Sequence, residues 1–254
     1  MEHIISSDIE AQNLIKKYKL KDLHNLIYQN LIEVGIILGE QYSFINNQTY
    51  PRPSHPNINF RKEVIYTICG IIISLRTTLE NEKKATNNLI NEYPDIDLLK
   101  FAKVEKVADL IKVAGMQNNK AEKIVNIINS DIDYESLKQL SIKEIINILE
   151  KLPGVGQKSI DCILLLGLDK PSFIVDINVF RLINRLFGLN NELNFNSKKQ
   201  VLEVKNFLET NLPKDTKLYQ ILHTLFLLHG KYICKSKPKC RECFIKRYCK
   251  YEKR

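Results

Sequence analysis

The stretch Leu152-Pro-Gly-Val-Gly-Gln-Lys158, which continues through an apolar run to Ile174-Val-Asp176, decides the fold of this chain. Gly154 and Gly156 allow the backbone to turn with positive φ, and they leave room for a ligand to come close. Lys158 opens a helix-like run, where unpaired backbone N–H groups and the helix dipole favour an anion such as phosphate. The stretch therefore predicts a phosphate-binding turn between two helices.

The residues before this turn predict the first of the two helices. Ser141 and Glu144 have the spacing of a capping box, so we expect a helix that begins there and ends near Lys151. Together with the run from Lys158 to Gly167, this gives a helix-hairpin-helix. A Pro-Gly-x-Gly sequence between helices is often only a turn, so the turn alone leaves DNA binding and a purely structural role open.

Lys158 and Asp176 lie on either side of the short apolar helix that follows the turn. A lysine amine can form a Schiff base with a sugar aldehyde carbon, and a nearby carboxylate is a suitable partner for that chemistry. Asp176 also stands where another helix would begin, which is the position of an ordinary N-cap. The two roles of Asp176 are compatible.

At this point the sequence resembles the endonuclease III group of DNA base-excision glycosylases. The segment 152–158 is similar to the helix-hairpin-helix of that family, and Val175-Asp176 to its catalytic aspartate. The resemblance continues in His229-Gly-Lys-Tyr-Ile-Cys234 and in Ile73-Ser-Leu-Arg-Thr-Thr78, and it covers roughly residues 62–251. It implies two catalytic residues, Lys158 and Asp176, and DNA contacts from Gly154, Gly156, Arg76 and Gln157.

Composition describes a globular, basic chain. Its 254 residues are 44% apolar, and its net charge of +9 fits a polyanionic partner, although lysine-rich surfaces also keep proteins soluble. The N-terminus lacks the basic and apolar regions of a signal peptide, and the longest apolar runs are too short to span a bilayer. We expect a soluble monomer inside the cell, cytoplasmic or associated with the nucleoid, without membrane contact.

Apolar residues recur at helical spacing along most of the chain, and no segment shows strict alternation. This pattern predicts an all-α protein. The segment 40–61 interrupts it with Pro51, Pro53 and Pro56, which favour an extended linker. Helices are expected before residue 39, from about residue 62, and over the ranges 79–93, 104–114, 120–129, 142–149, 158–167, 179–187, 198–208 and 217–228.

The family resemblance adds a domain arrangement that periodicity does not give. It implies a two-domain helix-hairpin-helix glycosylase fold, with a six-helix domain over residues 62–173. The second domain would combine the C-terminal residues 174–254 with the N-terminal helices of residues 1–39. Double-stranded DNA with a damaged or mismatched base would then lie across the cleft between the domains, facing Lys158 and Asp176.

Four cysteines near the C-terminus have the spacing C-x5-C-x2-C-x5-C, namely Cys234, Cys240, Cys243 and Cys249. In a reducing compartment this crowding indicates a metal site, and by spacing alone zinc and a [4Fe–4S] cluster are both open. The resemblance implies the [4Fe–4S] cluster, although the family usually has six residues between the first two cysteines. The basic residues of this loop either contact DNA phosphates or form a solvated tail. Cys69 and Cys162 are expected in the core.

The resemblance also implies a reaction. The enzyme would extrude the damaged nucleotide, and Arg76, where the family often has glutamine, would contact the orphaned base or else only cap the preceding helix. Lys158 would displace the base and β-elimination would cut the strand, while Asp176 stabilises the oxocarbenium charge. Oxidised pyrimidines are the implied substrates. A thymine or uracil mismatch glycosylase and a non-catalytic DNA-binding module are the alternatives, since Gln157, Asn178 and Leu79 depart from common family residues.

Overall fold

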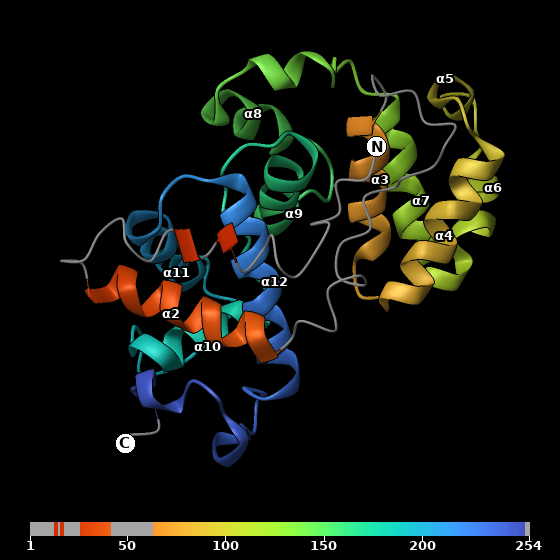
Figure 1. The fold of residues 1–254 in the computed structure, drawn as a ribbon. Helices are drawn as coiled ribbons and strands as arrows, with labels where there is room; N and C mark the ends of the chain where they lie inside the picture. The colour runs from red at the N-terminus through yellow and green to blue at the C-terminus, as the bar shows by residue number, and fades with distance from the viewer. Residues whose placement is uncertain (1–12, 15, 18–25, 42–62, 252–254) are drawn as a thin grey trace. The chain divides into compact units, whose positions relative to one another are not determined.

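The computed structural model describes residues 13–14, 16–17, 26–41 and 63–251, and all the regular elements in these ranges are helices (Figure 1). The all-α prediction is confirmed. The described chain forms two compact units. The hairpin unit contains residues 63–170, and the cysteine unit contains residues 26–41 and 171–251. The predicted domain limits stay predictions, and nearly all of the predicted linker 40–61 lies outside the described residues.

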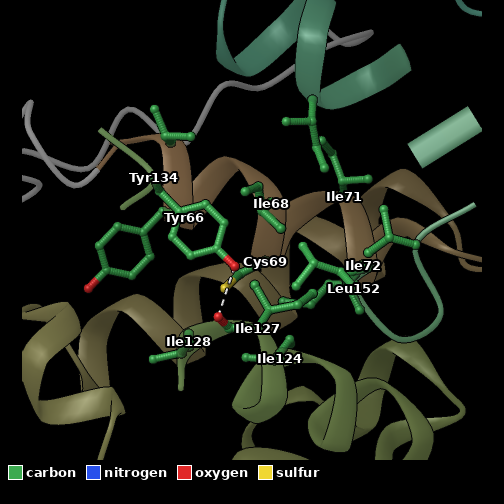
Figure 2. Close-up of a cluster of buried hydrophobic side chains, with 14 of the residues drawn as sticks. Tyr66, Ile68, Cys69, Ile71, Ile72, Ile124, Ile127, Ile128, Tyr134 and Leu152 are labelled. Atoms are coloured by element: carbon green, nitrogen blue, oxygen red, sulfur yellow. Dashed lines mark hydrogen bonds between the residues drawn. The ribbon is translucent and has the colours of Figure 1, made fainter. Parts of the chain in front are cut away.

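The hairpin unit begins with a helix that is apolar on almost every side. This helix, α3 (Glu63–Ser74), packs against α4 (Leu79–Glu92), α7 (Gln117–Ile128), α9 (Gln157–Cys162) and the π-helix η5 (Ile163–Gly167). A helix that is hydrophobic all round is expected to be buried, and Figure 2 shows side chains of α3 and α7 packed together in this core. Cys69 is buried here and Cys162 packs against the cluster, so the core prediction for both is confirmed.

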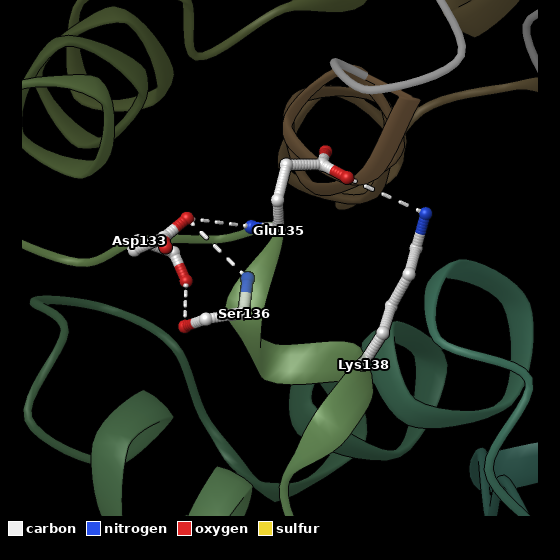
Figure 3. A network of polar contacts seen from close by, with 4 residues as sticks. All are labelled: Asp133, Glu135, Ser136 and Lys138. Atoms are coloured by element: carbon white, nitrogen blue, oxygen red, sulfur yellow. Dashed lines mark hydrogen bonds and ion pairs between the residues drawn. The ribbon is translucent and has the colours of Figure 1, made fainter.

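Shorter elements complete this unit. They are α5 (Ile96–Leu99), α6 (Val104–Ile111), η3 (Lys112–Ala114), η4 (Ser136–Gln139) and α8 (Ile142–Leu149). The link between α7 and α8 is held by local polar contacts (Figure 3). The Asp133 carboxylate accepts from the N–H groups of Glu135 (3.1 Å) and Ser136 (3.3 Å), and Lys138 pairs with Glu135 at 3.5 Å.

The cysteine unit is built around α12 (Thr216–Tyr232), which packs against α10 (Ile177–Phe187) and α2 (Leu26–Gln41). The unit also contains α11 (Lys198–Asn211) and two short 3₁₀ helices, η6 (Cys240–Glu242) and η7 (Lys246–Tyr248). Ser197 and Asp215 cap α11 and α12 with their side chains. No described helix is both long enough and apolar enough to pass through a membrane.

Several helix bounds differ from the prediction, and α11 and α12 end three and four residues later than expected. Helix α7 begins at Gln117, three residues before the predicted start, because the left-handed residue Met116 precedes it and provides no side-chain cap for a sequence pattern to reveal. The elements α5 and η4 were not predicted, since four residues are too few to show a helical period.

Candidate active site and cysteine loop

The helix-hairpin-helix is formed by α8, the turn after it and α9. The predicted capping box is present, because the Ser141 N–H donates to Glu144 Oε2 at 2.8 Å and the Glu144 N–H donates to Ser141 Oγ at 3.3 Å. Helix α8 ends at Leu149, and Gly156 is the N-cap of α9. The capping box therefore fixes the first helix of the hairpin, and a glycine begins the second.

The two glycines of the turn have different conformations. Gly154 has φ +75°, the left-handed conformation that favours glycine, whereas Gly156 is extended with φ −94°. The prediction of positive φ is thus confirmed for Gly154 and wrong for Gly156. A Cβ on Gly154 would lie 2.2 Å from Cε of Lys123, while a Cβ on Gly156 would meet nothing within 4 Å. At Gly156 the glycine leaves open space beside the backbone instead of permitting a special conformation.

Lys158 is exposed in the first turn of α9. Its neighbour Gln157, a predicted DNA contact, is also exposed, and its Nε2 donates along the helix to Oδ1 of the buried Asp161 at 3.0 Å. The side chain of Gln157 is therefore tied to its own helix. The DNA contacts of both residues stay predictions.

A carboxylate that the sequence did not single out lies in the electrostatic environment of Lys158. Burial raises the pKa of Glu82, in the first turn of α4, to about 7, and Lys158 is the positive charge that most opposes this increase. Smaller opposing effects on this pKa come from Lys83 and Lys120. In the sequence Glu82 is one of two acidic residues at a helix start, a common position, so no pattern marks it.

We predict that Glu82→Gln makes the stability of the protein less dependent on pH. The pKa of Glu82 rises from 4.5 to about 7 on folding, so the wild type loses stability as pH increases through this range, while the neutral glutamine does not. After discounting for partial exposure, the variant should be more stable than wild type by about 2 kcal/mol at pH 8 and similar to it at pH 4. Urea unfolding across this pH range measures the difference.

Glu80→Gln is the matched control, because Glu80 lies in the same helical turn and is exposed. It should leave the pH dependence of the unfolding free energy unchanged. Equal pH profiles for Glu82→Gln and wild type would contradict the buried, charge-coupled environment of Glu82.

Arg76 lies in the turn between α3 and α4. It has φ +53° and an exposed side chain, and two residues later Thr78 caps α4 by accepting from the Asn81 N–H at 3.3 Å. A non-glycine residue with positive φ is uncommon, so the surrounding structure must hold this conformation. The predicted contact between Arg76 and DNA is not tested by this geometry and stays a prediction.

Asp176 is the N-cap of α10, in the cysteine unit. Its Oδ1 accepts from the N–H groups of Asn178 at 2.9 Å and Val179 at 2.8 Å, so the predicted capping role is confirmed. The carboxylate is mostly buried, with 8% of the residue exposed. Lys158 belongs to the hairpin unit, and the expectation that the two residues face one cleft stays a prediction.

The backbone before Asp176 is held by two neighbouring helices. His223 of α12 hydrogen-bonds the carbonyl oxygen of Ile174 through Nδ1 at 2.8 Å. The Phe173 N–H donates to Oε1 of Glu209, on α11, at 2.8 Å, and the Phe173 ring packs against Tyr219 with centroids 5.1 Å apart. These contacts hold the backbone segment that precedes Asp176, and they thereby fix the position of Asp176 at the start of α10.

Polar contacts also connect Asp176 to the start of the cysteine loop. Asn178 donates through Nδ2 to Oδ2 of Asp176 at 3.2 Å and accepts at Oδ1 from Arg181 at 3.0 Å. Arg181 in turn donates to the carbonyl oxygens of Cys234 and Gly230, each at 2.7 Å. A Cβ on Gly230 would lie 2.7 Å from Cβ of Asn178, so a glycine is required where α12 meets α10. Asn178, a departure from the family pattern, is thus part of the support of Asp176.

The four cysteines of the loop line one pocket. Its other lining residues are apolar, basic or aromatic, apart from His229: Leu182, Arg185, Leu186, Ile233, Pro238, Lys239, Ile245, Lys246 and Tyr251. None of the four forms a disulfide. Among the described residues, no three His, Cys, Asp or Glu side chains are arranged as ligands of a single metal ion.

The chemistry of this pocket suits thiolate ligation of a cationic group. Burial raises the pKa of Cys234, and it raises the pKa of Cys243 to about 11, so bare thiolates are disfavoured there and need a positive partner. Burial lowers the pKa of His229 to about 4, which keeps this imidazole neutral, and its Nε2 lies 3.5 Å from Sγ of Cys243. Four cysteine donors without a carboxylate in the lining fit a thiolate-bound metal centre, either an iron–sulfur cluster or zinc.

Comparisons with known proteins agree with this geometry. The family model described as HhH-GPD superfamily base excision DNA repair protein matches residues 69–214. Endonuclease III of Thermotoga maritima is 35% identical over 189 residues, which are 74% of this chain and 83% of the relative.

Two solved structures show the same fold. A trapped endonuclease III–DNA covalent intermediate has a TM-score of 0.64 at 21% identity, covering 90% of this chain and 98% of that one. A thermostable thymine-DNA glycosylase has a TM-score of 0.61 at 24% identity, covering 88% and 96%. At these identities the likeness concerns the fold alone.

Proposed function

This chain belongs to the endonuclease III family, within the HhH-GPD superfamily of base excision DNA repair proteins, and we propose that it excises oxidised pyrimidines from double-stranded DNA and then cuts the strand. It is a DNA glycosylase and AP lyase. One observation carries the proposed mechanism: Lys158 is exposed in the first turn of the helix that follows the hairpin. There an amine lies beside the place where the hairpin amides would bind a phosphate of the DNA backbone.

Base removal proceeds by attack of the Lys158 amine on C1′ of the extruded nucleotide. A bond forms between Nζ and C1′, and the glycosidic bond breaks as the base leaves with the bonding electrons and is protonated. Asp176 balances the positive charge that develops on the sugar. The contacts of Asp176 with Asn178 and the α10 amides hold the carboxylate in one orientation for this role.

Strand cleavage follows from the same covalent intermediate. After Nζ loses a proton, its lone pair forms a C=N bond to C1′ as the C1′–O4′ bond breaks and O4′ takes a proton, which opens the sugar ring to a protonated imine. This cation makes the 2′-proton acidic. Removal of that proton expels the 3′ phosphate as the C3′–O bond breaks, which is β-elimination. Both steps depend on one nitrogen atom, so a single substitution at Lys158 tests both.

We assign the cysteine pocket to a [4Fe–4S] cluster held by Cys234, Cys240, Cys243 and Cys249. The cluster would supply a structural cross-link for a loop whose own helices are only three residues long. The loop is basic, and together with the net charge of +9 this supports binding to DNA phosphates. We propose that the protein binds DNA inside the cell as a monomer.

The choice of substrate is tested by a panel of duplexes of one sequence, each with a single oxidised pyrimidine or a single mismatch. We expect release of oxidised pyrimidines at rates at least about tenfold above those for thymine or uracil opposite guanine, a difference of about 1.4 kcal/mol in transition-state stabilisation. Preferred release from the mismatches would favour the alternative, a mismatch glycosylase. That alternative has support in the fold shared with the thymine-DNA glycosylase.

We predict that Gly156→Ala weakens binding to damaged and undamaged duplex alike, by about tenfold, and leaves stability nearly unchanged. The extended backbone accepts alanine, and its Cβ would meet no protein atom, so the methyl group occupies only the space where the DNA backbone would approach. Fluorescence anisotropy with both duplexes, beside thermal unfolding, measures the two effects.

Gly154→Ala is the contrasting variant, because its positive φ strains any other residue. It should lower stability as well as affinity. A change in lesion preference with unchanged affinity for undamaged DNA in Gly156→Ala would contradict the phosphate-binding role of the hairpin.

A further inference from the structure

A fully buried lysine lies in the core of the hairpin unit. Lys120, in the first turns of α7, is only 1% exposed. Its ammonium donates to the carbonyl oxygens of Ile73 and Ala114, each at 2.8 Å. A buried charge lowers stability unless it is hydrogen-bonded. The ammonium of Lys120 must therefore make contacts that an apolar leucine or methionine could not make.

The two carbonyl groups explain the choice of an ammonium. Ile73 is in the last turn of α3, where carbonyls have no partner within the helix and the dipole is negative. Ala114 ends η3, so its carbonyl has the same need. One cation therefore satisfies the ends of two helical segments that are 41 residues apart in the sequence.

Both segments lead directly into exposed turns with unusual backbone conformations. Arg76, three residues after Ile73, has φ +53°, and Met116, two residues after Ala114, has φ +51°. Both side chains are exposed, Met116 by 49%. Lys120 thus connects the two chain segments that lead into these left-handed residues, Arg76 and Met116.

The Arg76 turn has only long backbone hydrogen bonds of its own. The Leu75 N–H donates to Ile72 at 3.3 Å and the Thr77 N–H donates to Ser74 at 3.4 Å. The contact from Lys120 to Ile73 is shorter and carries a full charge, and such bonds are about twice as strong as neutral ones. Lys120 is therefore a stronger restraint than either of these two backbone bonds, and it acts beside the hydrogen bond from Ser74 Oγ to the Ile71 carbonyl at 2.7 Å.

We propose that Lys120 is a positioning residue, whose buried ammonium holds the Arg76 turn in the conformation that presents the guanidinium to DNA with a missing or extruded base. This inference rests on the proposed function, since it requires that Arg76 contacts such DNA. Glu82 supports it, because its charge favours the ammonium form of Lys120, while burial lowers the pKa of this lysine. Lys120 itself touches neither the substrate nor the reacting atoms in this proposal.

The test measures binding without catalysis. The observed quantity is the ratio of affinities for a duplex with a stable tetrahydrofuran abasic analogue and for the intact duplex of the same sequence. We expect Lys120→Met, which keeps the volume and removes the charge, to lower this ratio about tenfold, as the loss of one charged hydrogen bond at the turn would. Arg76→Ala should lower it by a similar factor, and the double variant no further than either single one.

Tyr134→Phe is the matched control for lost stability. It removes another buried hydrogen bond of the same unit, from the Tyr134 hydroxyl to the carbonyl of Ile127 at 2.9 Å. It should lower the melting temperature and leave the affinity ratio unchanged. Lys120→Arg keeps the donors and should have an affinity ratio close to that of wild type. Amide hydrogen exchange at Leu75 and Thr77 should be faster in Lys120→Met than in wild type, and it should be unchanged in Tyr134→Phe and Lys120→Arg.

If Lys120→Met does not fold, Lys120→Gln replaces it, because its shorter side chain cannot reach both carbonyls. An unchanged affinity ratio in the folded Lys120 variant would overturn the proposal. So would a Lys120 substitution that lowers the ratio by the same factor in Arg76→Ala as in wild type. An affinity ratio that does not depend on Arg76 would overturn it as well. None of these outcomes affects base release or strand cleavage through Lys158, so the glycosylase function stands or fails separately.

Discussion

Lys158→Gln abolishes strand cleavage and covalent trapping, with a decrease of at least about 10⁴-fold in the single-turnover rate. The expected size follows from the proposed mechanism, in which Lys158 Nζ is the atom that would form the covalent bond to C1′. Glutamine is one atom shorter but remains a polar, exposed side chain, so the hairpin backbone and its capping box should be unchanged. Affinity for the damaged duplex should fall by less than about tenfold, the effect of losing one phosphate-facing charge.

The measurement uses a duplex with an intact oxidised pyrimidine, incubated with borohydride. Wild type should be reduced onto the DNA through its imine, and Lys158→Gln should give no adduct. A pre-formed abasic site is unsuitable, because it reacts with many exposed amines. Lys151→Gln is the matched control, since Lys151 is exposed at the start of the same turn. Full strand cleavage by Lys158→Gln would mean that another residue supplies the nucleophile, and base release without trapping would indicate an activated water.

Local patterns in the sequence predict the parts of this site that depend on neighbouring residues. The capping box of Ser141 and Glu144, the positive φ of Gly154 and the N-cap role of Asp176 all follow from residue types and spacing within a few positions. Such features are encoded locally because their hydrogen bonds join residues two or three positions apart. The same reasoning placed helix α8 at its observed bounds.

The contacts that position the site join residues far apart in the sequence, and no spacing rule reveals them. Lys120 binds a carbonyl 47 residues away, and Arg181 binds one 53 residues away. The shift in the pKa of Glu82 likewise depends on burial and on Lys158, which are properties of the folded chain. In the sequence these three residues look like ordinary helix-surface charges. Only packing shows that Lys120 is bonded to the chain before the Arg76 turn, that Arg181 is linked to the Asp176 cap through Asn178, and that Glu82 is coupled to Lys158.

The cysteine loop is an intermediate case. Its spacing predicts four ligands without any knowledge of the fold, since four thiols within sixteen residues have few other uses in a reducing compartment. The identity of the bound group depends on the pocket around the sulfur atoms, which includes side chains from α10 and α12. Spacing alone leaves zinc and iron open, because four thiolates suit either group.

Cys240→Ser is the second variant with a large expected effect, because it should remove the cluster and unfold the loop together. The loop is held by η6 and η7, each of three residues, and Ile245 is its main buried apolar side chain. A core this small is expected to need a cross-link, so the binding energy of the proposed cluster would be folding energy. We expect a loss of at least about 3 kcal/mol in the unfolding free energy of the cysteine unit.

Wild-type protein prepared without oxygen should be yellow-brown, absorb near about 400 nm and contain about four irons per chain, since thiolates bound to iron give charge-transfer bands and thiolates bound to zinc do not. Cys240→Ser should lose this absorbance and most of the iron. Cys162→Ser, outside the loop and packed against the core of the hairpin unit, is the matched cysteine control and should keep both. A colourless wild type with stoichiometric zinc would reject the cluster. Full metal content and stability in Cys240→Ser would instead show that Cys240 is not a ligand, and the shortened spacing would then have displaced it from the site.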